Sequence, residues 1–133
     1  MKVFIFIEKN REYNNFKEIY MEYLKRLKYK TEIFYFKNEK DIMNKLPKKY
    51  NLIQVVNHGY YLTSEDFAKK IYNCENTGND LCFYLSNSLD LAKIKSDPLN
   101  ISNIVSSNNL ALTLLLEQIY RATTILDGKT YHK

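Results

Sequence analysis

Hydrophobic and polar positions along the chain alternate between two periods. Short apolar runs bounded by turn residues are typical of buried β-strands, and they predict strands at 2–7, 31–36, 51–56, 81–85 and 101–105. Between them, apolar residues return every three to four positions, which predicts helices at 12–27, 39–46, 63–72, 88–95 and from 108 or 109 to 126. Strands that alternate with helices predict an α/β fold, with a mostly parallel sheet covered on both faces, in one domain over residues 1–133.

Turn and capping residues set the expected boundaries. The third strand is expected to end at Asn57-His58-Gly59, and Pro47 closes the helix before it because proline cannot continue a helix. Thr63 is a predicted N-cap, with acidic residues in the turn that follows. Asp97-Pro98 is expected to end the short helix that precedes the fifth strand.

Ligands of open parallel sheets bind outside the carboxyl ends of the strands. In this chain the loops at those ends are 58–59, 86–88 and 106–109. We therefore expect the chemistry to lie in these three loops or in the C-terminal tail.

The net charge of the chain is only weak evidence for the kind of partner that it binds. The 133 residues include 20 basic and 15 acidic ones, and the formal net charge of +5 suits a polyanion such as RNA. Abundant lysine, asparagine, isoleucine and tyrosine also indicate an AT-rich coding bias, which raises the charge by itself. The three glycines, Gly59, Gly78 and Gly128, lie far apart, so the clustered glycines of a phosphate-binding loop are absent from the sequence.

Other residue types exclude several kinds of site. The spacing of Cys74 and Cys82 matches neither a redox pair nor a zinc knuckle, so two free, buried thiols are expected. The apolar run 3–7 is too short for a transmembrane span or a signal peptide, and we expect a cytoplasmic protein that makes no membrane contact. With His58 and His132 as the two histidines, neither a metal site nor a Ser-His-Asp set is discernible.

The C-terminal stretch, 114–133, has the most distinctive chemistry. A helix with the sequence Leu-Glu-Gln-Ile-Tyr-Arg-Ala at 116–122 runs to a turn at Gly128, and the chain ends in Tyr131-His132-Lys133. This pattern resembles the RlmH family of SPOUT-class methyltransferases, which act on N3 of a pseudouridine in large-subunit ribosomal RNA. The resemblance extends upstream to 22–27, 59–68 and 78–80, and an apparent deletion falls near 38–44.

The resemblance implies a SPOUT-type fold with a C-terminal trefoil knot, a homodimer, S-adenosylmethionine as cofactor and ribosomal RNA in the large ribosomal subunit as partner. It assigns cofactor contacts to Val55, Asn87, Ile101, Ser102, Asn103, Ile104, Val105 and Ser106. The chain departs from the family here. The family's Gly-Gly turn falls on Ser86-Asn87-Ser88, its Pro-His pair on Ser107-Asn108, and an arginine on Leu112. In this chain, a side chain therefore projects at the turn where the resemblance implies that the glycine backbone contacts the cofactor.

The resemblance also points to Tyr131, His132 and Arg121 as catalytic residues. The N3 imide must lose its proton before it attacks a sulfonium methyl, and a neutral imidazole can accept that proton while a phenol donates to a carbonyl oxygen. Arg121 would bind phosphate or stabilise the imide anion. The alternatives are a polar tail without a site, and an i,i+4 ion pair between Arg121 and Glu117. For His58, a capping or surface role is the better interpretation.

Three functions compete at this point. The first is a ribosomal RNA methyltransferase that uses S-adenosylmethionine. The second is a catalytically lapsed knotted dimer that binds RNA or protein, which the altered glycine turn and the missing Pro-His pair favour. The third is a flavodoxin-like small-molecule binder, and the C-terminal motif argues against it.

Overall fold

The structure is a computed structural model that describes residues 1–8, 13–86, 91, 93–100 and 108–128. Its strands form one sheet in the order β2-β1-β4-β3-β5, and all of the described pairings are parallel. The strands are β1 (Val3–Glu8), β2 (Thr31–Phe36), β3 (Tyr50–Tyr61), β4 (Asp80–Leu85) and β5 (Asp97–Asn100). The helices are α1 (Tyr13–Arg26), α2 (Glu39–Lys45), α3 (Ser64–Asn76) and α4 (Asn108–Leu126). The predicted α/β class with a parallel sheet is thus confirmed.

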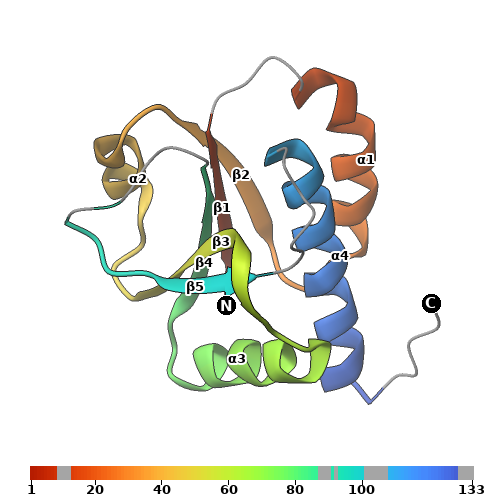
Figure 1. The fold of residues 1–133 in the computed structure, drawn as a ribbon. Coiled ribbons are helices and arrows are strands. Elements are labelled where there is room, and N and C mark those ends of the chain that lie inside the picture. Colours follow the sequence, from red (N-terminus) through yellow and green to blue (C-terminus); the bar gives the residue numbers. More distant parts are fainter. Residues whose placement is uncertain (9–12, 87–90, 92, 101–107, 129–133) are drawn as a thin grey trace.

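Helices cover both faces of the sheet (Figure 1). On one face, α4 packs between α1 and α3, and on the other lies α2. Successive residues of a strand point to opposite faces, so Ile5 joins the core beneath α4 while Phe6 joins the core beneath α2. Both side chains are fully buried. A central strand buried on both faces explains the unbroken apolar run at the start of the sequence.

The predicted start of α3 is confirmed by its cap. The Thr63 side chain accepts a hydrogen bond from the Asp66 backbone N–H, which makes Thr63 the N-cap of α3. The prediction placed the end of α3 near Tyr72, whereas the helix continues to Asn76. One more turn buries Cys74 in the core, and this tertiary contact is not visible in the local sequence pattern.

Strand β3 is longer than predicted. Instead of ending at Asn57-His58-Gly59, it continues to Tyr61, where it pairs with Asn100 after a shift in register. Gly59 adopts φ +84°, a conformation that glycine takes without steric cost, and its carbonyl accepts a 3.0 Å hydrogen bond from Asn100 Nδ2. The residues expected to form a turn therefore form an irregularity within the strand.

Two further predictions, both in the region before α4, are wrong. Residues 93–95, expected at the end of a short helix, are not helical, and β5 occupies 97–100, four residues before the expected strand. Proline was expected to act as a stop, yet Pro98 is tolerated because β5 is at the edge of the sheet. The expected strand 101–105 lies outside the described residues. The trefoil knot depends in part on undescribed segments on either side of β5, and it stays a prediction.

Candidate functional site

The carboxyl ends of β3, β4 and β5 meet at one edge of the sheet. Val55 of β3 is paired with Leu85 of β4 on one side and with Leu99 of β5 on the other. Leu85 precedes the predicted cofactor residue Asn87 by two positions, and Leu99 precedes Ile101 by two. Asn87 and 101–106 themselves lie outside the described residues, but the chain enters both segments from points that flank Val55.

Val55 is itself a core residue. Only 7% of it is exposed, and it belongs to the apolar cluster between the sheet and the helices α1, α3 and α4. Its side chain can therefore offer a ligand apolar surface but no polar contact.

A pocket of about 190 Å³ lies beside Val55, between the ends of β3 and β5 and the helix α3. Its lining is mainly apolar, and the residues are Val56, Gly59, Leu62, Lys70, Pro98, Leu99 and Asn100. Asn100 is 2% exposed and donates to the Gly59 carbonyl, which holds the two strand ends together. The sequence pattern did not reveal Asn100, because the fifth strand was expected four residues later.

A second polar contact lies at the end of β4. The Ser86 hydroxyl donates a 2.9 Å hydrogen bond to Oε2 of Glu8, the last residue of β1. Ser86 is the first of the three residues on which the resemblance places the family's glycines, and its side chain is directed to the neighbouring strand β1. The sequence held no signal for this pair, because 78 positions separate the two residues.

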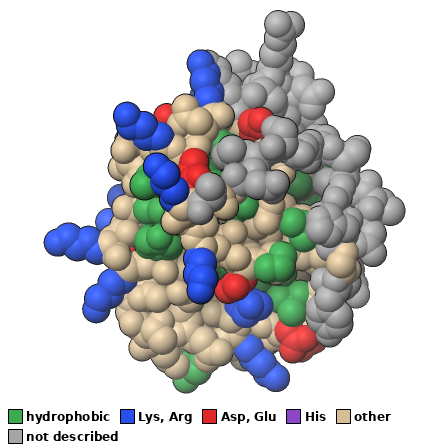
Figure 2. All heavy atoms as spheres, turned by 60° about the vertical axis from the view of Figure 1, so that its left-hand side comes forward, with side chains coloured by type: hydrophobic (Ala, Val, Ile, Leu, Met, Phe, Trp, Pro, Cys, Tyr) green, Lys and Arg blue, Asp and Glu red, His purple; other side chains and the backbone are tan. Residues whose placement is uncertain are grey.

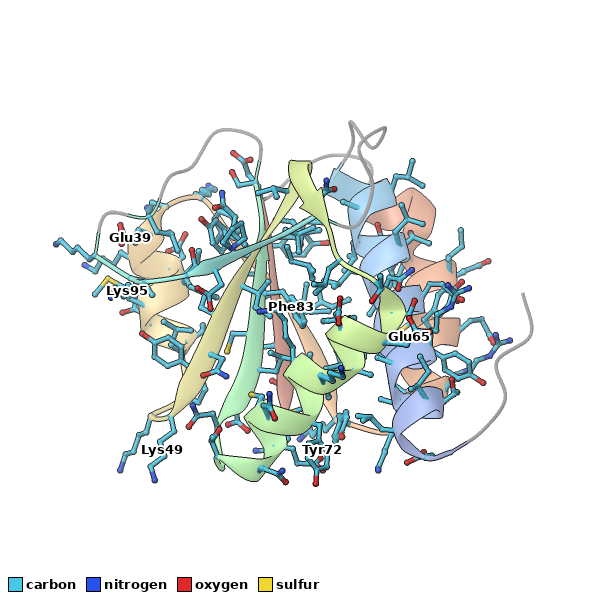
Figure 3. All side chains as sticks on the ribbon, turned by 60° about the horizontal axis from the view of Figure 1, so that its bottom comes forward. Glu39, Lys49, Glu65, Tyr72, Phe83 and Lys95 are labelled. Atoms are coloured by element: carbon cyan, nitrogen blue, oxygen red, sulfur yellow. The ribbon has the colours of Figure 1, made fainter. Side chains whose placement is uncertain are left out.

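Arg121 joins α4 to the beginning of α3. Its Nη1 donates to Ser64 Oγ at 3.4 Å, and Ser64 Oγ donates in turn to Gln118 Oε1 at 3.2 Å. Figure 3 shows Glu65, in the first turn of α3, on the side of that helix next to α4. The guanidinium thus lies half-buried at the positive end of a helix dipole, an arrangement that suits an anionic group.

Glu117, the alternative partner expected for Arg121, contacts another helix. It accepts a hydrogen bond from the hydroxyl of Tyr23 on α1. Burial raises the pKa of Tyr23, and the bond to the carboxylate raises it further. The Glu117 carboxylate therefore links α4 to α1.

The other two predicted catalytic residues, Tyr131 and His132, lie outside the described residues, but the place where their segment leaves α4 is defined. Asp127, just after α4, forms an ion pair of 3.1 Å with Lys28, which precedes β2. The end of α4 is thereby held at the amino edge of the sheet. Because α4 has 19 residues, its two ends are roughly 28 Å apart, and its first residue follows the predicted cofactor segment.

Three other predictions concern the cysteines, membrane contact and metal binding. Cys74 and Cys82 are free and buried, as predicted. None of the described helices is both long and apolar enough to cross a lipid bilayer. Within the described ranges, no three His, Cys, Asp or Glu side chains gather as a metal site would require.

Comparison with known proteins agrees with this fold. A family model described as "Predicted SPOUT methyltransferase" matches residues 1–132. Among curated proteins, "Ribosomal RNA large subunit methyltransferase H" of Clostridium botulinum (strain Eklund 17B / Type B) is 36% identical over 97 residues, which are 69% of this chain and 61% of that protein. The protein of the same name from Desulfotalea psychrophila is 30% identical over 132 residues, which are 84% of this chain and 86% of that protein.

Coverage differs among these relatives. A third, from Finegoldia magna, is 35% identical over 107 residues and is covered to 67% of its length. The match thus spans about three fifths of the Clostridium relative but most of the Desulfotalea one. The family model matches nearly all of the chain, and the C-terminal resemblance is confirmed. The chain therefore belongs to the SPOUT methyltransferase family, in the group that contains the large-subunit methyltransferases H.

Proposed function

We propose that this chain forms one SPOUT domain over residues 1–133 and, as a cytoplasmic homodimer, transfers a methyl group from S-adenosylmethionine to N3 of a pseudouridine in large-subunit ribosomal RNA. Family membership supports methyl transfer, and the names of its relatives support ribosomal RNA as the substrate. The cofactor and the target atom follow the resemblance of the C-terminal motif.

The observation that carries the proposal is the placement of the two ends of α4. The predicted cofactor segments adjoin the carboxyl edge of the sheet, whereas the Asp127–Lys28 ion pair holds the other end of α4 at the amino edge. The five residues from Asp127 to His132 reach at most about 18 Å, whereas α4 is roughly 28 Å long. We therefore expect a tail that acts on the cofactor to come from a second copy, as in a homodimer with shared sites.

The proposed chemistry divides among three side chains. His132 accepts or orients the N3 proton, and Tyr131 donates to a pyrimidine carbonyl. Arg121 places a permanent positive charge where negative charge develops on the imide or where a phosphate binds. The chemistry that S-adenosylmethionine supplies when bound is a methyl group on a positively charged sulfur.

The chemical character of the described residues near this edge suits S-adenosylmethionine. Val56 and Leu99 present apolar surface in a pocket that Lys70 and Asn100 also line. The pocket is smaller than the roughly 300–1,000 Å³ of complete small-molecule sites, so it suits one part of a ligand, such as an adenine ring. The remaining contacts would come from Asn87 and 101–106.

Complementation between inactive chains tests the proposal. One chain lacks 131–133, and the other has the substitution Ser102→Arg in the predicted cofactor segment. Each alone is expected to bind ribosomes without methylating them, and the mixed dimer is expected to regain activity because one of its two sites is intact. Wild-type protein that neither binds S-adenosylmethionine in calorimetric titration nor methylates large ribosomal subunits would rule out the enzyme.

That last result would favour the second candidate, a non-catalytic SPOUT dimer that binds RNA or protein. The hydrogen bond from Ser86 to Glu8 is the observation in its favour, because it places a side chain at the turn where the family has glycine. Restoring the turn by Ser86→Gly together with Asn87→Gly should then confer cofactor binding that the wild-type chain lacks.

A further inference from the structure

The side of the molecule that carries α2 is basic. Figure 2 shows this side, on which lysine and arginine side chains outnumber acidic ones. We name as the lysine face the exposed lysines on α2, at its two ends and before β5, namely Lys37, Lys40, Lys45, Lys48, Lys49, Lys93 and Lys95.

Among the described residues, the excess of positive charge lies on the lysine face. Its seven lysines are accompanied by three described acidic residues, Glu39, Asp41 and Asp97, a difference of four. The other described residues include nine basic and ten acidic side chains, so their net charge is −1. A coding bias toward lysine would distribute charge over the whole surface, so it does not account for this concentration.

Two of these three carboxylates bind backbone groups. Glu39 Oε2 accepts a 2.8 Å hydrogen bond from the backbone N–H of Lys93, and Asp41 Oδ2 accepts one of 2.9 Å from that of Lys37. The described ion pairs of lysine lie elsewhere, as in Lys28–Asp127. Within the described part of the chain, no carboxylate is within 4.0 Å of the ammonium groups of the lysine face. Their charge is therefore available to a partner.

The lysine face is built on a packed layer. Ile42 of α2 is fully buried and Ile94 is 8% exposed, and both belong to the core cluster on this side of the sheet. Lys93 and Lys95 flank Ile94 and point outward, while the Glu39–Lys93 hydrogen bond ties their segment to the start of α2. The lysines thus project from one fixed surface formed by segments 54 positions apart in sequence.

We propose that the lysine face binds the phosphate backbone of the RNA substrate and positions it for the site at the carboxyl edge. This inference rests on the proposed function for the identity of the RNA. Clustered cations bind phosphates independently of sequence and fix the register of a nucleic acid, whereas the reacting base is selected elsewhere.

The position of the lysine face suits this role. Lys37 follows the end of β2 at the carboxyl edge, and Lys48 and Lys49 precede β3 at the amino edge. Figure 3 shows Glu39 and Lys95 toward one end of the face and Lys49 toward the other, on the far side of the molecule from Glu65. The seven residues of α2 span about 10 Å, so with both flanks the face matches several consecutive phosphates.

Binding to large-subunit ribosomal RNA, measured over a range of salt concentrations, tests the inference. The variant Lys40→Gln, Lys48→Gln, Lys49→Gln removes three charges from the lysine face. The matched control, Lys17→Gln, Lys25→Gln, Lys69→Gln, removes three exposed charges from α1 and α3. The first variant is expected to bind at least about tenfold more weakly, with a salt slope lower by about two to three, while the control changes little.

Equal losses in both variants would show that only net charge matters and would overturn the inference. It also fails if neither variant loses affinity, if the wild-type protein does not bind RNA, or if the face binds only anionic phospholipid vesicles. Cofactor titration and methylation are measured on the same proteins. If RNA binding depends on the lysine face but no methylation occurs, the proposed function is refuted and this inference stands. If methylation is the same in both variants and in wild type, this inference is refuted and the proposed function stands.

Discussion

Arg121 Nη1 and Ser64 Oγ form a 3.4 Å hydrogen bond that joins α4 to the first residue of α3. The same hydroxyl donates to Gln118, so a single serine fixes two side chains on one face of α4. The guanidinium is thereby positioned by α3, the helix that follows β3 in the chain. The end of β3 lines the pocket near Val55.

This contact separates a catalytic role of Arg121 from a structural one. Arg121→Lys keeps the charge but loses the planar fork, and methylation of large ribosomal subunits is expected to fall at least about tenfold. Ser64→Ala removes the hydrogen bond but leaves the guanidinium, and only a several-fold loss is expected. If the two substitutions reduce methylation equally while thermal stability is unchanged, Arg121 acts only by holding α3.

Removal of 131–133 is expected to abolish methylation without affecting dimerisation. The deletion takes away the proposed proton acceptor and phenol, while the Asp127–Lys28 ion pair that secures the end of α4 is retained. Methylation assays and light scattering measure the two properties. A truncated dimer that still methylates ribosomes would show that Tyr131 and His132 have no catalytic role.

Cys82 and Cys74 should be inert in the folded protein. Cys82 is fully buried, and burial, with Asp80 nearby, raises its pKa from 9.0 to about 12, while burial also raises the pKa of Cys74. A thiol-reactive chromophore at mildly alkaline pH should therefore label neither cysteine until guanidinium chloride unfolds the chain. Rapid labelling of the native protein would mean that β4 and the end of α3 open readily.

The fold was largely predictable because its signals are local. The apolar runs that became β1 and β4 are buried on both faces, and Thr63 identified the start of α3. The errors arose where tertiary contacts override local rules. Pro98 lies in an edge strand, and Gly59 extends β3 because Asn100 bonds to its carbonyl.

The site was predictable in outline but not in its contacts. The rule that ligands bind at the carboxyl ends of strands selected this edge, and the resemblance added Val55. The β-sheet register places Leu85 and Leu99 on either side of Val55. The pairs Ser86–Glu8 and Arg121–Ser64 join residues 78 and 57 positions apart, which no local pattern encodes. The family motif pointed to Arg121 but not to the helix it contacts.

Gly59→Ala should destabilise the fold by about 1 kcal/mol. A Cβ added to Gly59 would meet no described atom within 4 Å, so the expected loss comes from the backbone at φ +84° alone. Gly59→Asn should lose less, because asparagine tolerates positive φ better than alanine. Urea unfolding of both variants measures the difference, and equal stability of wild type and Gly59→Ala would show that the backbone at this point relaxes.

Tyr23 and Glu117 give the stability of the fold a dependence on alkaline pH. Burial and the hydrogen bond to Glu117 raise the pKa of Tyr23 above its ordinary value of 10.0. A group whose pKa is raised on folding stabilises the folded state fully below its unfolded pKa, and the stabilisation is lost as pH rises through the folded pKa. The contact between α1 and α4 should therefore weaken above about pH 10.

Comparison with Tyr23→Phe isolates this contribution, because the pKa of Tyr29 is raised as well, by burial and by Glu75. At neutral pH the variant should be less stable than wild type by about 1 kcal/mol, the usual contribution of one hydrogen bond. Above pH 10 the difference in unfolding free energy should shrink, because the wild-type hydroxyl ionises next to a carboxylate. A difference that stays constant or grows with pH would mean that the Tyr23 hydroxyl bonds to water rather than to Glu117, and that α1 is held to α4 by apolar packing alone.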